Sequence, residues 1–173
     1  MVACVSLLVS ATTWGNTWLW TGGGGANGNW NNPANWLSGG IPGNGDTVVF
    51  QGSTGLNTTN NIAGLTLNQI RFISGGFTLY GNSFTLTNSI VATNFAGSAV
   101  INTSFTIGTA DVLLLTSNGV TLTLNQKFSG GVGVNKAGLG TVIYNGPHNN
   151  TYSGTTLVSA GTLQLNVYGT NAF

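Results

Sequence analysis

Short runs in which threonine alternates with an apolar residue recur along most of this chain, usually led by glycine or serine. They read GLTL at 64–67, GFTL at 76–79, SFTL at 83–86, VTLTL at 120–124 and GTLQL at 161–165. A period of two, bounded by Gly, Asn and Ser, is the pattern of short β-strands joined by tight turns. Strong helix formers are scarce, because the chain has three Lys and Arg, two Asp and Glu and one Met. The sequence therefore predicts an all-β protein.

The spacing of these runs favours a β-solenoid. Gly64, Gly119 and Gly161 open similar strands that lie 55 and 42 residues apart. Such loose periodicity indicates stacked coils with loops of different length, at roughly 25 residues a coil and about seven coils. Gly and Asn would form the corners, Thr the outer face and Leu, Ile, Val and Phe the inner face. A β-sandwich is the alternative, since short strands with frequent turns suit it too.

We divide the chain into one domain with a cap. Residues 1–13 are expected to be an apolar N-terminal strand, either a donor strand or a residual signal segment, and residues 47–173 are expected to form the coils. Between them, residues 14–46 contain all five tryptophans and the glycine-rich stretch TGGGGANGNWNNPANWLSGGIPGNGD. The open end of a solenoid exposes core side chains, so an irregular aromatic segment at this place is expected to cover it.

The first eleven residues, MVACVSLLVSA, have two interpretations. They contain the apolar run of a secretory signal, but no Lys or Arg precedes that run. They also suit a strand donated to a neighbouring copy. The run is shorter than the roughly 20 apolar residues that span a bilayer, and we predict no transmembrane segment. Cys4 is the single cysteine, so no intrachain disulfide is expected.

The near-absence of charge excludes several classes of partner. Charged residues make up 3% of the chain, and the formal net charge is +1. Nucleic acids and anionic membranes bind clustered Lys and Arg, whereas Arg71, Lys127 and Lys136 are scattered. We therefore expect no nucleic-acid partner. Low net charge gives little repulsion between copies, so association of the chain with itself is favoured.

The few titratable side chains indicate no catalytic or metal site. Asp46 lies in GNGD and Asp111 follows GTA, both turn positions where Asp accepts hydrogen bonds from backbone amides. His148 lies in the polar loop NGPHNN without a second ligand nearby. General acid–base catalysis needs titratable groups held together. We expect neither enzymatic activity nor a metal or other cofactor.

The tryptophans are the strongest functional candidates, and three roles are open for them. They can cover the end of the solenoid, line a subunit interface, or stack on a glycan. For the interface, the candidates are Val2, Val5, Leu7, Leu8, Val9, Trp14, Trp18 and Trp20. For the glycan, Trp30 and Trp36 are the first candidates within the cluster.

The segment at 130–165 resembles the autotransporter-associated β-strand repeat, also called the passenger-associated transport repeat. The matching residues are Gly130-Gly131, NKAGLGT at 135–141, NTYSGTT at 150–156 and AGTLQL at 160–165. The openings WNNPANW and PGNGDTVVF also look like the start of bacterial surface proteins with this repeat. The resemblance implies a secreted or surface-displayed bacterial β-solenoid without catalytic residues. Lys136 occupies the lysine position of the repeat, which implies a structural role.

Two functions follow from these observations. The first is a structural subunit of an extracellular bacterial filament or surface layer. It would assemble head-to-tail, by addition of the N-terminal strand to the next copy or by stacking of solenoid ends. The alternative is a surface adhesin or carbohydrate-binding module that uses the tryptophan cluster. Both place the protein outside the cell or on its surface.

Overall fold

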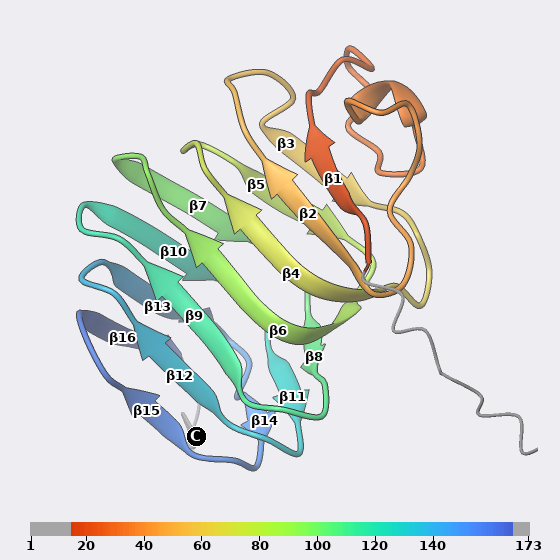
Figure 1. Ribbon diagram of the computed structural model, residues 1–173. Helices are drawn as coiled ribbons and strands as arrows, with labels where there is room; N and C mark the ends of the chain where they lie inside the picture. Colours follow the sequence, from red (N-terminus) through yellow and green to blue (C-terminus); the bar gives the residue numbers. More distant parts are fainter. Residues whose placement is uncertain (1–14, 168–173) are drawn as a thin grey trace, which may run out of the picture.

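The computed structural model describes residues 15–167, which form a parallel β-solenoid (Figure 1). Every strand pairing within the described part is parallel, apart from one isolated antiparallel bridge between Trp20 and Trp36. A sandwich built from antiparallel hairpins is therefore ruled out, and the prediction of a solenoid is confirmed. Within the same residues the one helix is the three-residue η1 (Pro33–Asn35), so no helix there could cross a membrane.

Two sheets face each other across the core. The first sheet runs β1 (Thr17–Trp20), β2 (Asp46–Phe50), β4 (Thr66–Phe72) and β6 (Phe84–Ala92). After β6 it divides into two arms, one of β8 (Phe105–Ile107), β11 (Phe128–Gly130) and β14 (Thr151–Tyr152), the other of β9 (Val112–Thr116), β12 (Val134–Ala137) and β15 (Thr156–Val158). The second sheet contains β3 (Asn57–Asn60), β5 (Thr78–Gly81), β7 (Gly97–Ile101), β10 (Val120–Leu124), β13 (Thr141–Gly146) and β16 (Thr162–Val167).

The coils are shorter and more regular than the sequence suggested. Successive partners in one column of the first sheet are 20 to 24 residues apart, and the second sheet has six strands, one for each turn. The irregular spacing of the glycines has a simple cause. Gly64 precedes β4 in the first sheet, whereas Gly119 and Gly161 precede β10 and β16 in the second. Their separations of 55 and 42 residues are therefore two and a half turns and two turns.

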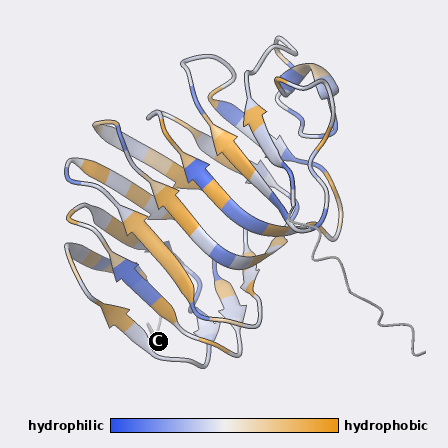
Figure 2. Cartoon of the chain, in the orientation of Figure 1, coloured by the Kyte–Doolittle hydropathy of each residue, from blue (hydrophilic) through white to orange (hydrophobic). Residues whose placement is uncertain are grey.

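Inward-facing side chains form columns parallel to the solenoid axis. In the first sheet one column runs Val48, Ile70, Ile90, Leu114 and Lys136, all at most 1% exposed. In the second sheet a column runs Leu79, Ile101, Leu124 and Tyr144, which are equally buried. Apolar and polar residues alternate along strands such as β10, as the threonine-rich pattern predicted, whereas β9 is apolar along most of its length (Figure 2). Burial of these columns supplies the main driving force for folding.

Aromatic rings stack along one corner of the solenoid, where the arm of β8, β11 and β14 begins. The ring centroids of Phe84, Phe105, Phe128 and Tyr152 follow one another at 5.5, 5.0 and 5.0 Å, with interplanar angles of at most 8°. Parallel pairing in register places the rings of Phe84, Phe105 and Phe128 directly on one another. Tyr152 pairs with Gly130, two positions further along, and its ring still stacks on that of Phe128. This spacing matches the distance between adjacent strands, so the stack adds one ring with each turn.

The tryptophan-rich segment covers the N-terminal end of the core. The ring of Trp36 contacts those of Trp20 and Trp30, and all three contact Phe50, at centroid distances of 5.0 to 6.4 Å. Asn32 caps η1 by accepting a hydrogen bond from Ala34 N, and Pro33 fixes its first residue. The region predicted as irregular also contains β1, which pairs with β2 as the first strand of the first sheet.

Polar side chains join the coils at the corner that follows the second sheet. Asn60 Nδ2 donates to Asn82 O at 3.0 Å, Thr103 Oγ1 donates to Gly81 O at 2.9 Å, and Asn145 Nδ2 donates to Asn125 Oδ1 at 2.9 Å. Gly81 has a φ of 104°, and a Cβ there would collide with the backbone of Asn60. The tight bend therefore requires glycine, as expected for a corner.

Tyr144 is expected to be a source of instability that phenylalanine relieves. Its hydroxyl is buried and has no hydrogen-bond partner within residues 15–167. Burial first, and then the neighbouring Tyr152, raise the pKa of Tyr144 far above its usual 10.0. We expect Tyr144→Phe to raise the free energy of unfolding by about 1 kcal/mol at pH 7. The measurement is urea unfolding followed by circular dichroism.

The same variant has a predicted effect on pH dependence. Above pH 10.0 the unfolded chain releases the proton of this hydroxyl while the folded protein keeps it, so stability falls as pH rises. In Tyr144→Phe this fall is about 1.4 kcal/mol per pH unit shallower. A variant that is less stable than the native protein at pH 7 would show that the hydroxyl is satisfied after all.

Candidate functional site

Three of the tryptophans named as candidates lie inside the protein. Trp20 and Trp30 are 0% exposed and Trp36 is 2% exposed. Their indole N–H groups donate to Gly55 O at 3.1 Å, Thr58 Oγ1 at 3.1 Å and Trp30 O at 2.8 Å, respectively. A sugar stacks only on an accessible ring face, and neither Trp30 nor Trp36 offers one. Trp20 is likewise covered, so its ring has no surface to place in a subunit interface.

Trp18, on β1, is the partly exposed tryptophan among the described residues. It lines a shallow groove with Asn16, Thr17 and Ser38. Gly40 lies against its six-membered ring, where a Cβ would overlap the ring. The groove combines one side of an aromatic ring with amide and hydroxyl groups, which is the combination that orients a polar ligand with apolar faces.

Asp46 holds this tryptophan in place. Its carboxylate accepts hydrogen bonds from Trp18 Nε1 at 2.6 Å, Asn16 N at 2.6 Å and Gly43 N at 2.7 Å. The bond from Gly43 is the turn contact that the sequence predicted. The bond from Trp18 was not predictable, because the two residues are 28 positions apart in the chain. With three donors on its carboxylate, Asp46 serves to fix the groove wall.

The other titratable candidates are separated from one another. Asp111 Oδ1 accepts a hydrogen bond from Gly133 N in the next coil at 2.6 Å, again a backbone contact. His148 is exposed in the loop after β13 and lines a hollow with Ser104, Gln126 and Lys127. No group of three or more His, Cys, Asp or Glu residues that could hold a metal ion occurs in the part of the chain that the structure describes.

Lys136 is fully buried, which the sequence did not indicate. It occupies the inward column of the first sheet, directly after Leu114. Its Nζ donates to Ala137 O at 2.9 Å, Gly138 O at 2.7 Å and Ala160 O at 3.0 Å. Two of these carbonyls belong to its own coil and one to the next. Burial lowers the pKa of Lys136 below the usual 10.5. The ammonium group thus joins two adjacent corners.

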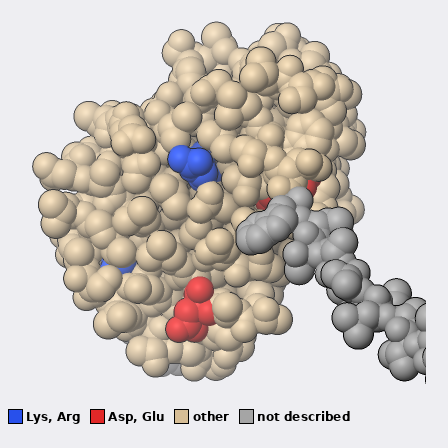
Figure 3. All heavy atoms as spheres, in the orientation of Figure 1, with Lys and Arg blue, Asp and Glu red and all other residues tan. Residues whose placement is uncertain are grey.

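The remaining interface candidates, Val2, Val5, Leu7, Leu8, Val9 and Trp14, lie outside the described residues. The surface that the structure does describe carries few charges. Figure 3 shows isolated charged side chains on an otherwise neutral face. A third hollow, more apolar than the other two, lies on the last coil and is lined by Tyr152, Thr156, Val158, Leu163 and Leu165 among others.

Comparison with known proteins relates the chain to a curated surface protein. No protein-family profile and no solved structure matches the chain. A stretch of 121 residues, 70% of the chain, is 32% identical to a curated protein, the adhesin BmaC autotransporter of Brucella suis biovar 1 (strain 1330). The chain spans 3% of the length of that protein. The solenoid fold and this similarity fit an autotransporter-like surface protein. No family profile identifies the particular repeat that residues 130–165 resemble.

Proposed function

We propose that this chain is a segment of a bacterial surface adhesin. The observation that carries the proposal is the agreement between the parallel β-solenoid and the similarity of 121 residues to an autotransporter adhesin. A solenoid held by continuous backbone ladders is a stiff support that presents binding surfaces along its length. The location would be the cell surface or the extracellular space. The neutral, hydroxyl-rich exterior can contact a partner there that carries no charge.

We further propose that the role is binding and not catalysis. The two carboxylates, Asp46 and Asp111, each accept backbone amide bonds in separate parts of the solenoid. Paired carboxylates that cleave glycosides lie within about 5 to 10 Å of each other and share one substrate. The groove beside Trp18 instead holds an oriented aromatic ring among neutral polar groups. It suits a neutral glycan that stacks one sugar ring on the indole.

Replacing Trp18 tests this assignment. We expect Trp18→Ala to weaken binding to immobilised neutral polysaccharides about tenfold or more, because an aromatic anchor is removed. Because Trp18 also bonds to Asp46, a second variant is needed. Ser38→Trp fills the groove and leaves that bond intact, and it should cause a similar loss. The measurement is a glycan array followed by titration calorimetry on the best neutral oligosaccharide.

Leu139→Ser is the matched control, since Leu139 is 72% exposed and does not line the groove. It should bind as the native protein does. Far-ultraviolet circular dichroism establishes that each variant keeps its strands. If Trp18→Ala and Ser38→Trp are both folded and both bind normally, the groove is not the adhesive site.

A filament subunit is the second candidate, favoured by the low charge that allows neutral faces to approach. Electron microscopy of the native protein separates the two functions. Regular unbranched filaments would support the subunit, and monodisperse particles that bind glycans would support the adhesin.

A further inference from the structure

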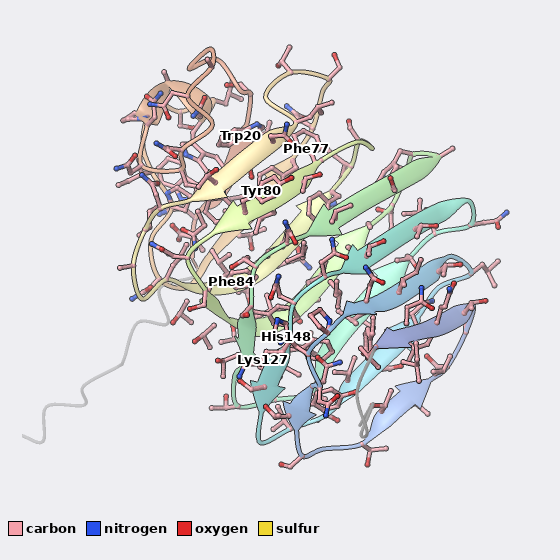
Figure 4. The ribbon with its side chains drawn as sticks, turned by 180° about the vertical axis from the view of Figure 1, so that it is seen from behind. Trp20, Phe77, Tyr80, Phe84, Lys127 and His148 are labelled. Atoms are coloured by element: carbon pink, nitrogen blue, oxygen red, sulfur yellow. The ribbon has the colours of Figure 1, made fainter. Side chains whose placement is uncertain are left out.

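A groove on the side of the solenoid gathers polar groups from three successive coils. It is lined by Ser104, Gln126, Lys127 and His148. Figure 4 shows Lys127 and His148 close together on neighbouring coils, at the corner where the chain leaves the second sheet. The groove is separate from the one beside Trp18, with which it shares no residue.

The register of the coils explains why these side chains meet. Phe105 and Phe128 are partners across β8 and β11, and both point into the aromatic stack. The residue before each phenylalanine must then face outward, which places Ser104 next to Lys127. Asn150 Oδ1 accepts the backbone N–H of Phe128 at 3.1 Å and fixes the loop that carries His148 beside this pair.

The polar groups of this groove are available to a ligand. Within residues 15–167, no hydrogen bond or ion pair engages the side chains of Ser104, Gln126, Lys127 or His148. Both described carboxylates are engaged elsewhere, with Asp46 bonded to the Trp18 indole and Asp111 to the backbone of the next coil. Of the other two cationic side chains, Lys136 is buried and Arg71 lies on β4. An ammonium group without a counter-charge therefore stands beside an imidazole, an amide and a hydroxyl.

We propose that this groove binds the carboxylate of an acidic sugar, as a second glycan site of the adhesin. Lys127 Nζ supplies the charge-assisted hydrogen bond to the carboxylate. Gln126, Ser104 and His148 supply neutral donors and acceptors for ring hydroxyls. One exposed lysine is too little for a nucleic acid, which needs many phosphate contacts. The inference rests on the proposed adhesin function, but it concerns a different groove and a different class of sugar.

Two acidic sugars share this chemistry, and paired probes distinguish them. Sialyllactose is compared with lactose, and trigalacturonate is compared with its methyl ester. We expect at least one acidic probe to bind about tenfold more tightly than its neutral partner, with the difference shrinking as sodium chloride rises from about 50 to about 500 mM. Preference for sialyllactose, for trigalacturonate or for both supports the site and identifies its sugar.

Substitution at Lys127 locates the effect. Lys127→Gln should lose the preference for the acidic probe, whereas Lys127→Arg should keep it. Arg71→Gln is the matched control, since it removes one positive charge outside the groove. The proposal is overturned if neither acidic probe is preferred, or if Arg71→Gln and Lys127→Gln weaken binding equally. The two sites can be tested separately. If Trp18→Ala binds neutral glycans normally but the acidic probe is still preferred through Lys127, only the Trp18 site is contradicted. If Trp18→Ala loses neutral-glycan binding but no acidic probe is preferred, only the Lys127 site is contradicted.

Discussion

Phe128→Ala is expected to lower the free energy of unfolding by about 3 to 5 kcal/mol, the largest effect of any single change we propose. Phe128 is 1% exposed and lies between the rings of Phe105 and Tyr152 at 5.0 Å on each side. Tyr144 meets its edge at 4.9 Å in a T-shaped contact. Alanine would leave a cavity in the middle of the stack. The backbone hydrogen bonds fix the spacing between strands, so the neighbouring coils cannot move together to fill it.

Urea unfolding measures this loss, with Leu139→Ala as the control at an exposed position. The control should change stability by less than about 0.5 kcal/mol. Phe128→Leu keeps most of the volume and should cost much less than alanine. If Phe128→Ala costs under about 1 kcal/mol, the stack contributes little and the coils are held chiefly by their backbone ladders.

Lys136→Met is expected to lower the free energy of unfolding by about 2 kcal/mol. Methionine keeps the apolar stem in the inward column but removes the three donors. The carbonyls of Ala137, Gly138 and Ala160 then lose the partner that joins their two coils. The variant no longer has to bury a charged ammonium group, and this gain offsets part of the cost. The expected loss of stability is therefore smaller than the loss from removing three independent hydrogen bonds. An equally stable variant would show that these carbonyls find other partners.

The pH dependence of stability provides a second test of Lys136. Because burial lowers its pKa, the folded protein releases this proton at a lower pH than the unfolded chain, whose value is 10.5. Between the two values the unfolded chain binds more protons, so stability rises with pH until about 10.5. The rise should vanish in Lys136→Met. Both proteins are best compared in a Tyr144→Phe background, because Tyr144 acts in the opposite direction above pH 10.0.

The alternation of threonine and apolar residues predicted short strands and their inner faces, and the spacing of the runs favoured a solenoid over the alternative of a β-sandwich. The length of a coil was harder to predict, because similar runs open strands in both sheets. Gly64 and Gly119 look equivalent in sequence, yet they introduce β4 and β10 in different sheets. The number of residues between these two glycines therefore includes a half turn. The length of one turn follows only from which strands pair with each other, and a single sequence does not show that pairing.

The site residues were less predictable than the fold. A cluster of tryptophans is compatible with a buried plug or with an exposed platform, and only packing separates Trp30 from Trp18. The burial of Lys136 depends on carbonyls of two coils that meet in three dimensions. The Lys127 groove was missed because its members lie up to 44 residues apart. One signal was available in the sequence. Lys127 directly precedes Phe128 and Ser104 directly precedes Phe105, so both occupy the same outward position on adjacent coils.

The stacking of coils of similar length also bears on how such a chain can change in evolution. Each coil pairs with the one before and the one after, about 22 residues away, and makes the same kind of contact with both. Duplicating or deleting one whole coil would leave every remaining interface complementary, whereas a change of a few residues within a strand would misalign the columns. Length can therefore vary in units of a coil without redesign of the core. A groove built from several coils, like that of Ser104, Lys127 and His148, would be copied only if those coils were duplicated together.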